Sequence, residues 1–122
     1  YYAGVEDYLT WDQMSMLRAD WIEIGSHTET HPALPRISRS HCYEEINGSK
    51  SLIEACLQVP CQSFCYPGGF FNHEVAEAVQ KAGYLSAVTT QYGRASLKQN
   101  MYQLPRIRIP RGMSINAFAK SL

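Results

Sequence analysis

Helix-like and strand-like segments alternate along this chain of 122 residues, and their order limits the possible folds more than any other feature. Helical spacing of apolar residues is found at 11–20, 37–58, 72–83 and after Ser114, and strand patterns are found at 22–26, 61–67, 85–90 and 106–110. Strands separated by helices favour parallel pairing with helical crossovers. The sequence therefore predicts the α/β class, as a parallel sheet or part of a barrel.

The charge balance and the apolar runs exclude several kinds of partner. Eleven basic and eleven acidic side chains give a formal net charge of zero, so no excess charge is available to hold a nucleic acid. No apolar run approaches the roughly 20 residues of a membrane helix. The first residues lack a secretion signal, although one could have been removed. We expect a soluble domain, and both a cytoplasmic and an extracytoplasmic location stay open.

Four cysteines occur without a CxxC pair, which argues against a zinc knuckle or a thioredoxin-type motif. They are Cys42, Cys56, Cys61 and Cys65. We interpret each as a small buried apolar residue, with a disulfide as the less favoured alternative.

His27 and His31 follow the strand pattern at 22–26 with a spacing of four residues. Two imidazoles at this spacing can converge on one metal ion, and ligand groups in parallel α/β folds gather at the carboxyl ends of strands. The alternative is two loop histidines without a ligand, because short motifs also arise by chance. The pair is a candidate metal site.

The segment "YPGG" at 66–69 also follows a strand pattern. A Gly-Gly turn leaves backbone N–H groups open and lets a substrate approach closely. Taken alone, a plain turn is the simpler interpretation.

Three stretches together, "EIGSHTETHP", "SFCYPGG" and "AGYLSAVTT", resemble the polysaccharide deacetylase family, also called the NodB-homology or carbohydrate esterase family 4 domain. The resemblance runs from about residue 9 to residue 110, and "LPRIRI" is similar to the branch of poly-N-acetylglucosamine deacetylases. It implies a distorted (β/α) barrel and hydrolysis of N-acetyl groups on an amino-sugar polysaccharide, with an N-acetylated glucosamine polymer as the expected substrate.

The resemblance also implies a metal site. His27, Thr28 and His31 match the H-[ST]-x-x-H motif of the family, whose two histidines bind a divalent metal together with an aspartate. Zinc is the leading candidate. Thr28 is then expected to brace the loop, whereas an ordinary turn threonine is its simpler reading.

The family's groove wall corresponds to the second motif. Gly68 would supply an oxyanion-stabilising N–H, and Tyr66, Pro67 and Gly69 would contact the substrate. For Tyr66, a buried position in a strand is an equally good interpretation. Cys65 stands where many relatives have an arginine, so the usual ion pair to the catalytic base is absent there.

Arg106 and Arg108 alternate in the strand pattern "RIRI", so we expect both on one side of it. Arg106 could enter the site to orient a carboxylate, partly replacing the arginine absent at Cys65. A pair of solvated arginines is an equally good interpretation.

The family's first motif, which supplies the metal aspartate and the catalytic base, has no match in this chain, and neither does its late histidine. Asp7, Asp12 and Asp20 lie in or beside the first helical segment and are interpreted as solvated, and His73 as a surface residue. We therefore expect residues 1–122 to be a deacetylase domain that is incomplete at its N-terminal side, with its first strands and the third metal ligand outside the chain.

Such a piece should be inactive alone and could self-associate through an exposed sheet edge. Two alternatives stay open. One is a catalytically degenerate carbohydrate-binding module with the same fold, and the other is an interaction module in which the histidines bind nothing.

Overall fold

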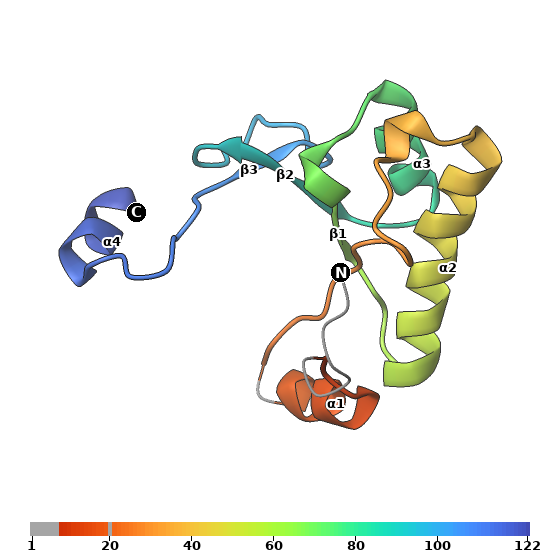
Figure 1. Cartoon of the computed structure of the whole chain (residues 1–122), viewed down its shortest axis with the longest axis horizontal. Coiled ribbons are helices and arrows are strands. Elements are labelled where there is room, and N and C mark those ends of the chain that lie inside the picture. Colours follow the sequence, from red (N-terminus) through yellow and green to blue (C-terminus); the bar gives the residue numbers. More distant parts are fainter. Residues whose placement is uncertain (1–7, 20) are drawn as a thin grey trace.

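A computed structural model describes residues 8–19 and 21–122 of the chain (Figure 1). In chain order its elements, where η marks a 3₁₀ helix, are α1 (Trp11–Ala19), η2 (Leu34–Arg36), α2 (Arg39–Leu57), β1 (Ser63–Cys65), η3 (Pro67–Gly69), α3 (His73–Lys81), β2 (Ser86–Tyr92), β3 (Leu104–Arg106) and α4 (Ile115–Ser121). Each of these α-helices lies inside a segment for which the sequence predicts a helix.

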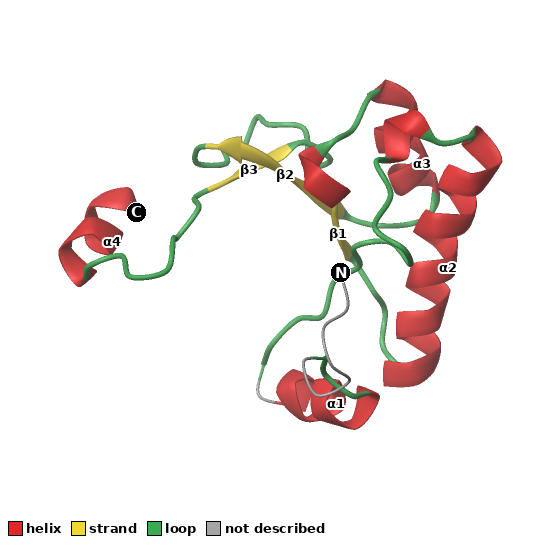
Figure 2. Ribbon diagram, in the orientation of Figure 1, coloured by secondary structure: helices red, strands yellow, loops and turns green. Residues whose placement is uncertain are grey.

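The strands form a parallel sheet in the order β1-β2-β3 (Figure 2). Ser63 is the register partner of Ser86 at the start of the β1-β2 ladder, and Tyr92 is that of Arg106 at the end of the β2-β3 ladder. Helix α3 connects β1 to β2 and provides the crossover that parallel pairing requires. The predicted α/β class with parallel strands is confirmed.

The strand patterns at 61–67 and 85–90 overlap β1 and β2, whereas the other two strand predictions differ more in extent. Within 22–26, only Ser26 pairs, through an isolated parallel bridge to Phe64, because β1 offers just three residues as a partner. The last strand lies at Leu104–Arg106 instead of 106–110, because β2 ends at Tyr92, opposite Arg106, and provides no partner beyond it. Arg108 therefore follows the strand instead of lying in it.

The core lies between the sheet and helices α2 and α3, which stand together on one side in Figure 1. Phe64 of β1 is buried in it, and its ring centroid lies 5.4 Å from that of Tyr66 and 5.1 Å from that of Tyr84. The Tyr84 hydroxyl donates to the carbonyl of Ile46 in α2 at 3.0 Å, and the Tyr66 hydroxyl donates to that of Tyr102 at 2.9 Å. The buried hydroxyl groups thus have partners, as buried polar groups need.

Local capping explains where three helices begin. Thr10 and Gln13 exchange the two hydrogen bonds of a capping box at α1. The side chains of Asn72 and Ser114 accept from the N–H groups of Val75 and Ala117, at 2.9 and 3.1 Å. Each capping residue lies directly before the helix that it begins. None of the described helices is long and apolar enough to cross a membrane.

The cysteines are free thiols in this structure. Cys42 and Cys61 are buried, and burial raises the pKa of each thiol. Cys65 is half-buried. The prediction of a buried residue is wrong for Cys56, which is exposed on α2.

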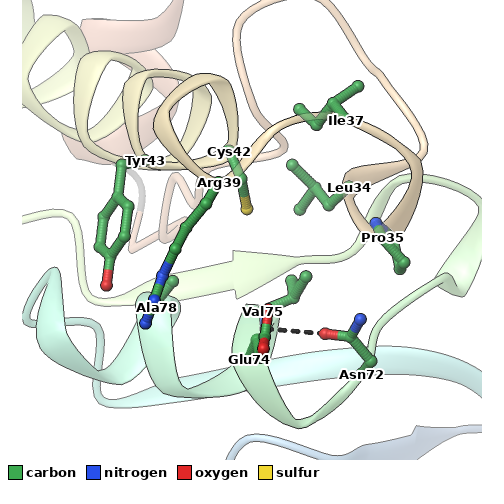
Figure 3. A pocket seen from close by; sticks show the side chains of 10 residues that line it. All are labelled: Leu34, Pro35, Ile37, Arg39, Cys42, Tyr43, Asn72, Glu74, Val75 and Ala78. Carbon is green, nitrogen blue, oxygen red and sulfur yellow. Dashed lines mark hydrogen bonds between the residues drawn. The ribbon is translucent and has the colours of Figure 1, made fainter.

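A small cavity lies between η2 and the first turns of α2 and α3 (Figure 3). Leu34, Cys42 and Val75 give it apolar walls, and Arg39 and Glu74 lie beside it. Its volume of about 60 Å³ is well below the roughly 300 Å³ of the smallest ligand pockets. We assign no ligand to it.

Candidate active site

The two histidines lie close together on the loop after the Ser26 bridge, which we call the histidine loop (residues 27–31). Their ring centroids are 4.7 Å apart and the rings are nearly perpendicular. Thr28 and His31 have φ values of 70° and 60°, in the left-handed region. This conformation costs a non-glycine residue about 1–2 kcal/mol, so contacts elsewhere must hold the loop.

Glu45 of α2 provides those contacts. Its carboxylate accepts the N–H groups of Glu29 at 2.8 Å and Thr30 at 2.9 Å, and also the Thr30 hydroxyl. Burial alone would raise the pKa of Glu45, but the hydrogen bonds from Thr30 and Glu29 outweigh it and the pKa is lowered. Gly48, one turn further on, lets the Glu29 side chain lie against the helix, since a Cβ there would be 2.0 Å from Glu29 Oε1.

Glu45 is not among the site residues that the sequence predicts. A signal was present, because Glu45 lies on the same helical face as Cys42 and Ser49, both buried. A carboxylate on the buried face of a helix needs hydrogen-bonding partners, and the nearby polar loop is where they could be sought.

Thr28 acts within the loop itself. Its hydroxyl donates to the carbonyl of His27, and its oxygen accepts from the His31 N–H at 3.1 Å. Thr28 thereby connects the two histidine positions directly, which is the contact pattern of a bracing residue.

His27 also connects the histidine loop to β1. Its Nδ1 lies 2.7 Å from the carbonyl oxygen of Cys65, so Nδ1 carries a proton and donates. Nε2 of a neutral imidazole in this state is an acceptor, as a metal ligand must be.

The donor set therefore fits part of a metal site. Two exposed imidazoles approach closely enough for one ion to reach both. Within residues 8–19 and 21–122, however, no group of three His, Cys, Asp or Glu side chains could hold a metal. Asp12 is exposed in the first turn of α1, and Asp7 and Asp20 lie outside the described residues.

The 3₁₀ turn η3, which we call the glycine turn, begins where β1 ends. Gly68 and Gly69 have φ values of 62° and 73°. A Cβ on Gly69 would lie 2.1 Å from Thr90 Oγ1, so the turn packs on β2 in a way that only glycine allows. Gly68 is exposed and lines a shallow hollow together with His31, Ala33, Pro67 and Phe70. The glycine turn and the histidine loop thus lie at the same end of the sheet, as expected for loops after parallel strands.

Tyr66 and Pro67 are fully buried. Burial raises the pKa of the Tyr66 phenol, whose hydroxyl is bonded to Tyr102. The sequence left two interpretations open for Tyr66, substrate contact and a buried position. The structure shows the buried position, with the Tyr66 ring facing the core. Tyr66 and Pro67 position the glycine turn, while their side chains have no open surface for a sugar.

Arg106, at the end of β3, reaches the same region. Its Nη1 donates to Cys65 Sγ at 3.3 Å, and Cys65 carries the carbonyl that His27 binds. Arg106 thus lies beside Cys65, the position at which the resemblance leads us to expect an arginine. Arg108 is exposed beyond the strand, and His73 is exposed at the start of α3, as predicted.

The parallel α/β sheet thus has a histidine pair, a glycine turn and an arginine at the carboxyl ends of its strands, an arrangement that fits the predicted NodB-type fold. Comparison with known proteins agrees. The sequence model of the family described as Polysaccharide deacetylase matches residues 2–87. The chain belongs to the polysaccharide deacetylase family.

Individual relatives show how much of the domain is present. The polysaccharide deacetylase-like protein YxkH of Bacillus subtilis (strain 168) is 36% identical over 115 residues, which cover 94% of this chain and 41% of YxkH. The structure of deacetylase PplD of Streptococcus pyogenes superposes with a TM-score of 0.88 at 28% identity, over 93% of this chain and 50% of PplD. BC0361, a polysaccharide deacetylase from Bacillus cereus, gives a TM-score of 0.86 at 28% identity, over 98% and 38%. The chain spans half or less of the length of these relatives.

Proposed function

We propose that this chain contributes the histidine loop and the groove wall of a metal-dependent deacetylase, which hydrolyses N-acetyl groups on a glucosamine-type polysaccharide. The observation that carries the proposal is the close approach of the His27 and His31 rings beside the glycine turn. The S. pyogenes relative was solved in complex with acetate, the acid that hydrolysis of an N-acetyl group releases.

His27 and His31 would hold the metal, with zinc as the leading candidate and an aspartate outside these 122 residues as the third ligand. A bound divalent ion supplies positive charge that activates water and polarises the acetyl carbonyl. The hydrogen bond from His27 Nδ1 to Cys65 keeps the other ring nitrogen available, and Thr28 and Glu45 keep the loop in its left-handed conformation.

Gly68 would stabilise the negative charge that develops on the acetyl oxygen, through its backbone N–H. Its exposed place beside His31 supports this role, because the carbonyl must reach the metal and the N–H together. Gly69 keeps the turn packed against Thr90, and the buried Pro67 fixes the start of the turn.

Arg106 would orient a carboxylate, the catalytic base that the resemblance expects outside this chain. A guanidinium suits this task because its planar fork pairs with both oxygens of a carboxylate. Arg106 contacts Cys65 through its guanidinium, and Cys65 also carries the carbonyl that accepts from His27.

Zinc titration by calorimetry tests the proposal on two proteins, the complete protein and the 122-residue chain. The complete protein should bind about one ion, because it adds the third ligand, and should release acetate from an N-acetylglucosamine oligomer. The chain alone should bind weakly and release none. Tight binding by the chain alone would mean that it contains the third ligand. Absence of binding and turnover in both would favour a degenerate carbohydrate-binding module.

The exposed sheet edge leads to a related expectation. The Ser26 segment is paired with β1 at one position, so most of its backbone groups are open to a partner strand. The isolated chain should therefore self-associate, and analytical ultracentrifugation over a range of concentrations would detect it.

A further inference from the structure

A groove opens where β2 and β3 end. It is lined by Thr90, Tyr92, Arg106, Ile107, Arg108 and Ile109, which we call the arginine groove. It adjoins the candidate active site, because Arg106 lines the groove and also contacts Cys65, whose carbonyl is bound by His27. A polymer bound at the histidine loop could therefore extend into it.

The part of the chain that contains the arginine groove is basic, although the chain as a whole has a formal net charge of zero. All eleven acidic residues lie at or before Glu77, together with four of the eleven basic ones. The remaining seven basic residues lie at 81, 94, 98, 106, 108, 111 and 120, with no acidic residue among them. The net charge of zero thus hides an acidic part and a strongly basic part, and the basic part contains the arginine groove.

The arginines of the groove are not neutralised within the described part of the chain. The ion pairs found there join His41 to Glu44, Lys50 to Glu54 and Lys81 to Glu77. Arg108 is exposed, and Arg106 has a thiol as its hydrogen-bond acceptor. Arg106 would be engaged by the catalytic base, which leaves the exposed Arg108 as the guanidinium that an anionic ligand can pair with.

The other lining residues suit a sugar. Tyr92 is 73% exposed and can offer a ring face to a sugar ring, and Ile107 is half-buried and gives an apolar floor. We propose that the arginine groove binds the acidic units of an anionic glycan, so that the enzyme prefers N-acetylglucosamine units joined to sugars that carry carboxylates. The inference rests on the proposed function for the reaction, but its binding half can be tested separately.

The experiment measures kcat/KM of the complete protein on two oligosaccharides of equal length. One contains only N-acetylglucosamine, and the other alternates N-acetylglucosamine with glucuronate. Arg108→Gln is the test variant, and Lys120→Gln on α4 is the matched control, because it removes the same charge outside the groove. We expect Arg108→Gln to lower the ratio of acidic to neutral kcat/KM about three- to tenfold, the effect of one charge-assisted contact. Lys120→Gln should leave the ratio unchanged.

Salt gives a second readout. The preference of the wild type for the acidic oligomer should shrink between about 20 mM and 500 mM salt, since exposed charges are screened. Equal kcat/KM for the two oligomers at low salt, or equal effects of the two variants, would overturn the inference and leave the proposed function standing.

A binding experiment tests the groove assignment separately from the proposed function. Calorimetry with an oligogalacturonate, which has carboxylates and no N-acetyl group, should show binding that Arg108→Gln weakens. If acetate is never released but this binding is seen, the proposed function fails and the groove assignment stands. Single-stranded DNA of the same charge serves as competitor, and tighter binding of the DNA would overturn the assignment to a glycan.

Discussion

His27 Nδ1 lies 2.7 Å from the carbonyl oxygen of Cys65 and joins the histidine loop to the strand that leads into the glycine turn. Because a carbonyl only accepts, this contact selects the imidazole state with the proton on Nδ1. This bond joins residues that are 38 positions apart in sequence and holds the histidine loop in a fixed relation to the start of the glycine turn.

This contact predicts an unusual histidine state in the metal-free complete protein. The neutral His27 ring should carry its proton on Nδ1, whereas the exposed His41, whose Nε2 lies 3.9 Å from Glu44, should carry it on Nε2. Nitrogen-15 NMR of the ring nitrogens distinguishes the two states. The same state at His27 as at His41 would show that the bond to Cys65 does not form in solution.

Glu45→Gln should loosen the histidine loop. The amide keeps the size of the side chain but loses the charge that accepts two N–H groups and a hydroxyl. We expect the free energy of unfolding, measured by urea unfolding, to fall by about 1–3 kcal/mol. We expect the metal affinity, measured by calorimetry, to fall about 10–100-fold. Glu44→Gln, on the exposed face next to it, is the control and should change stability by no more than about 0.5 kcal/mol. Equal effects of the two changes would show that Glu45 does not hold the histidine loop.

Gly69→Ala tests the packing of the glycine turn. The new Cβ would meet Thr90 Oγ1 at 2.1 Å and Thr90 Cβ at 2.8 Å, and the φ of 73° disfavours alanine. Gly112→Ala has a similar φ of 80° with nothing within 4 Å, so it isolates the backbone cost, about 1–2 kcal/mol. Gly69→Ala should cost about 1–3 kcal/mol more in unfolding free energy, because of overpacking. A smaller loss than at Gly112 would mean that the turn does not pack on Thr90.

Acid should destabilise the protein partly through Glu45 and Glu54. The pKa of Glu54 is lowered by its hydrogen bond from Lys50 and by that from the Cys61 N–H, and the pKa of Glu45 is lowered by the hydrogen bonds from the histidine loop. A carboxyl with a lowered pKa stabilises the fold above its unfolded pKa of about 4.3, and this stabilisation is lost as the pH falls through the folded value. Urea unfolding between about pH 6 and pH 3 should show the loss, and Glu45→Gln should make it smaller. An unchanged slope in the variant would contradict the shift at Glu45.

Local features of this fold could be predicted from the sequence, and contacts between distant segments could not. Asn72 and Ser114 were identifiable as caps because a cap and its helix are neighbours in the chain. The strand limits were not, because the pairing length of 22–26 depends on β1 and that of β3 depends on where β2 ends.

In the candidate site, too, local motifs could be predicted and contacts between distant segments could not. The histidine and glycine motifs are local patterns, so the sequence alone identified them. The support of Thr30 by Glu45, and the contact of Arg106 with Cys65, depend on how α2 and β3 pack. The net charge was misleading for a related reason, because a sum over the chain does not show which charges the fold brings to one groove.

Acetate release from a neutral N-acetylglucosamine oligomer is the most direct measurement of the central claim, that the histidine loop belongs to a deacetylase site. The complete protein should be assayed as wild type, as His27→Ala and as His73→Ala, the last removing an exposed histidine at the start of α3. We predict that His27→Ala lowers kcat/KM by at least about 100-fold, as loss of a metal ligand should, while His73→Ala keeps the wild-type value. A His27→Ala protein that releases acetate at the wild-type rate would contradict the account.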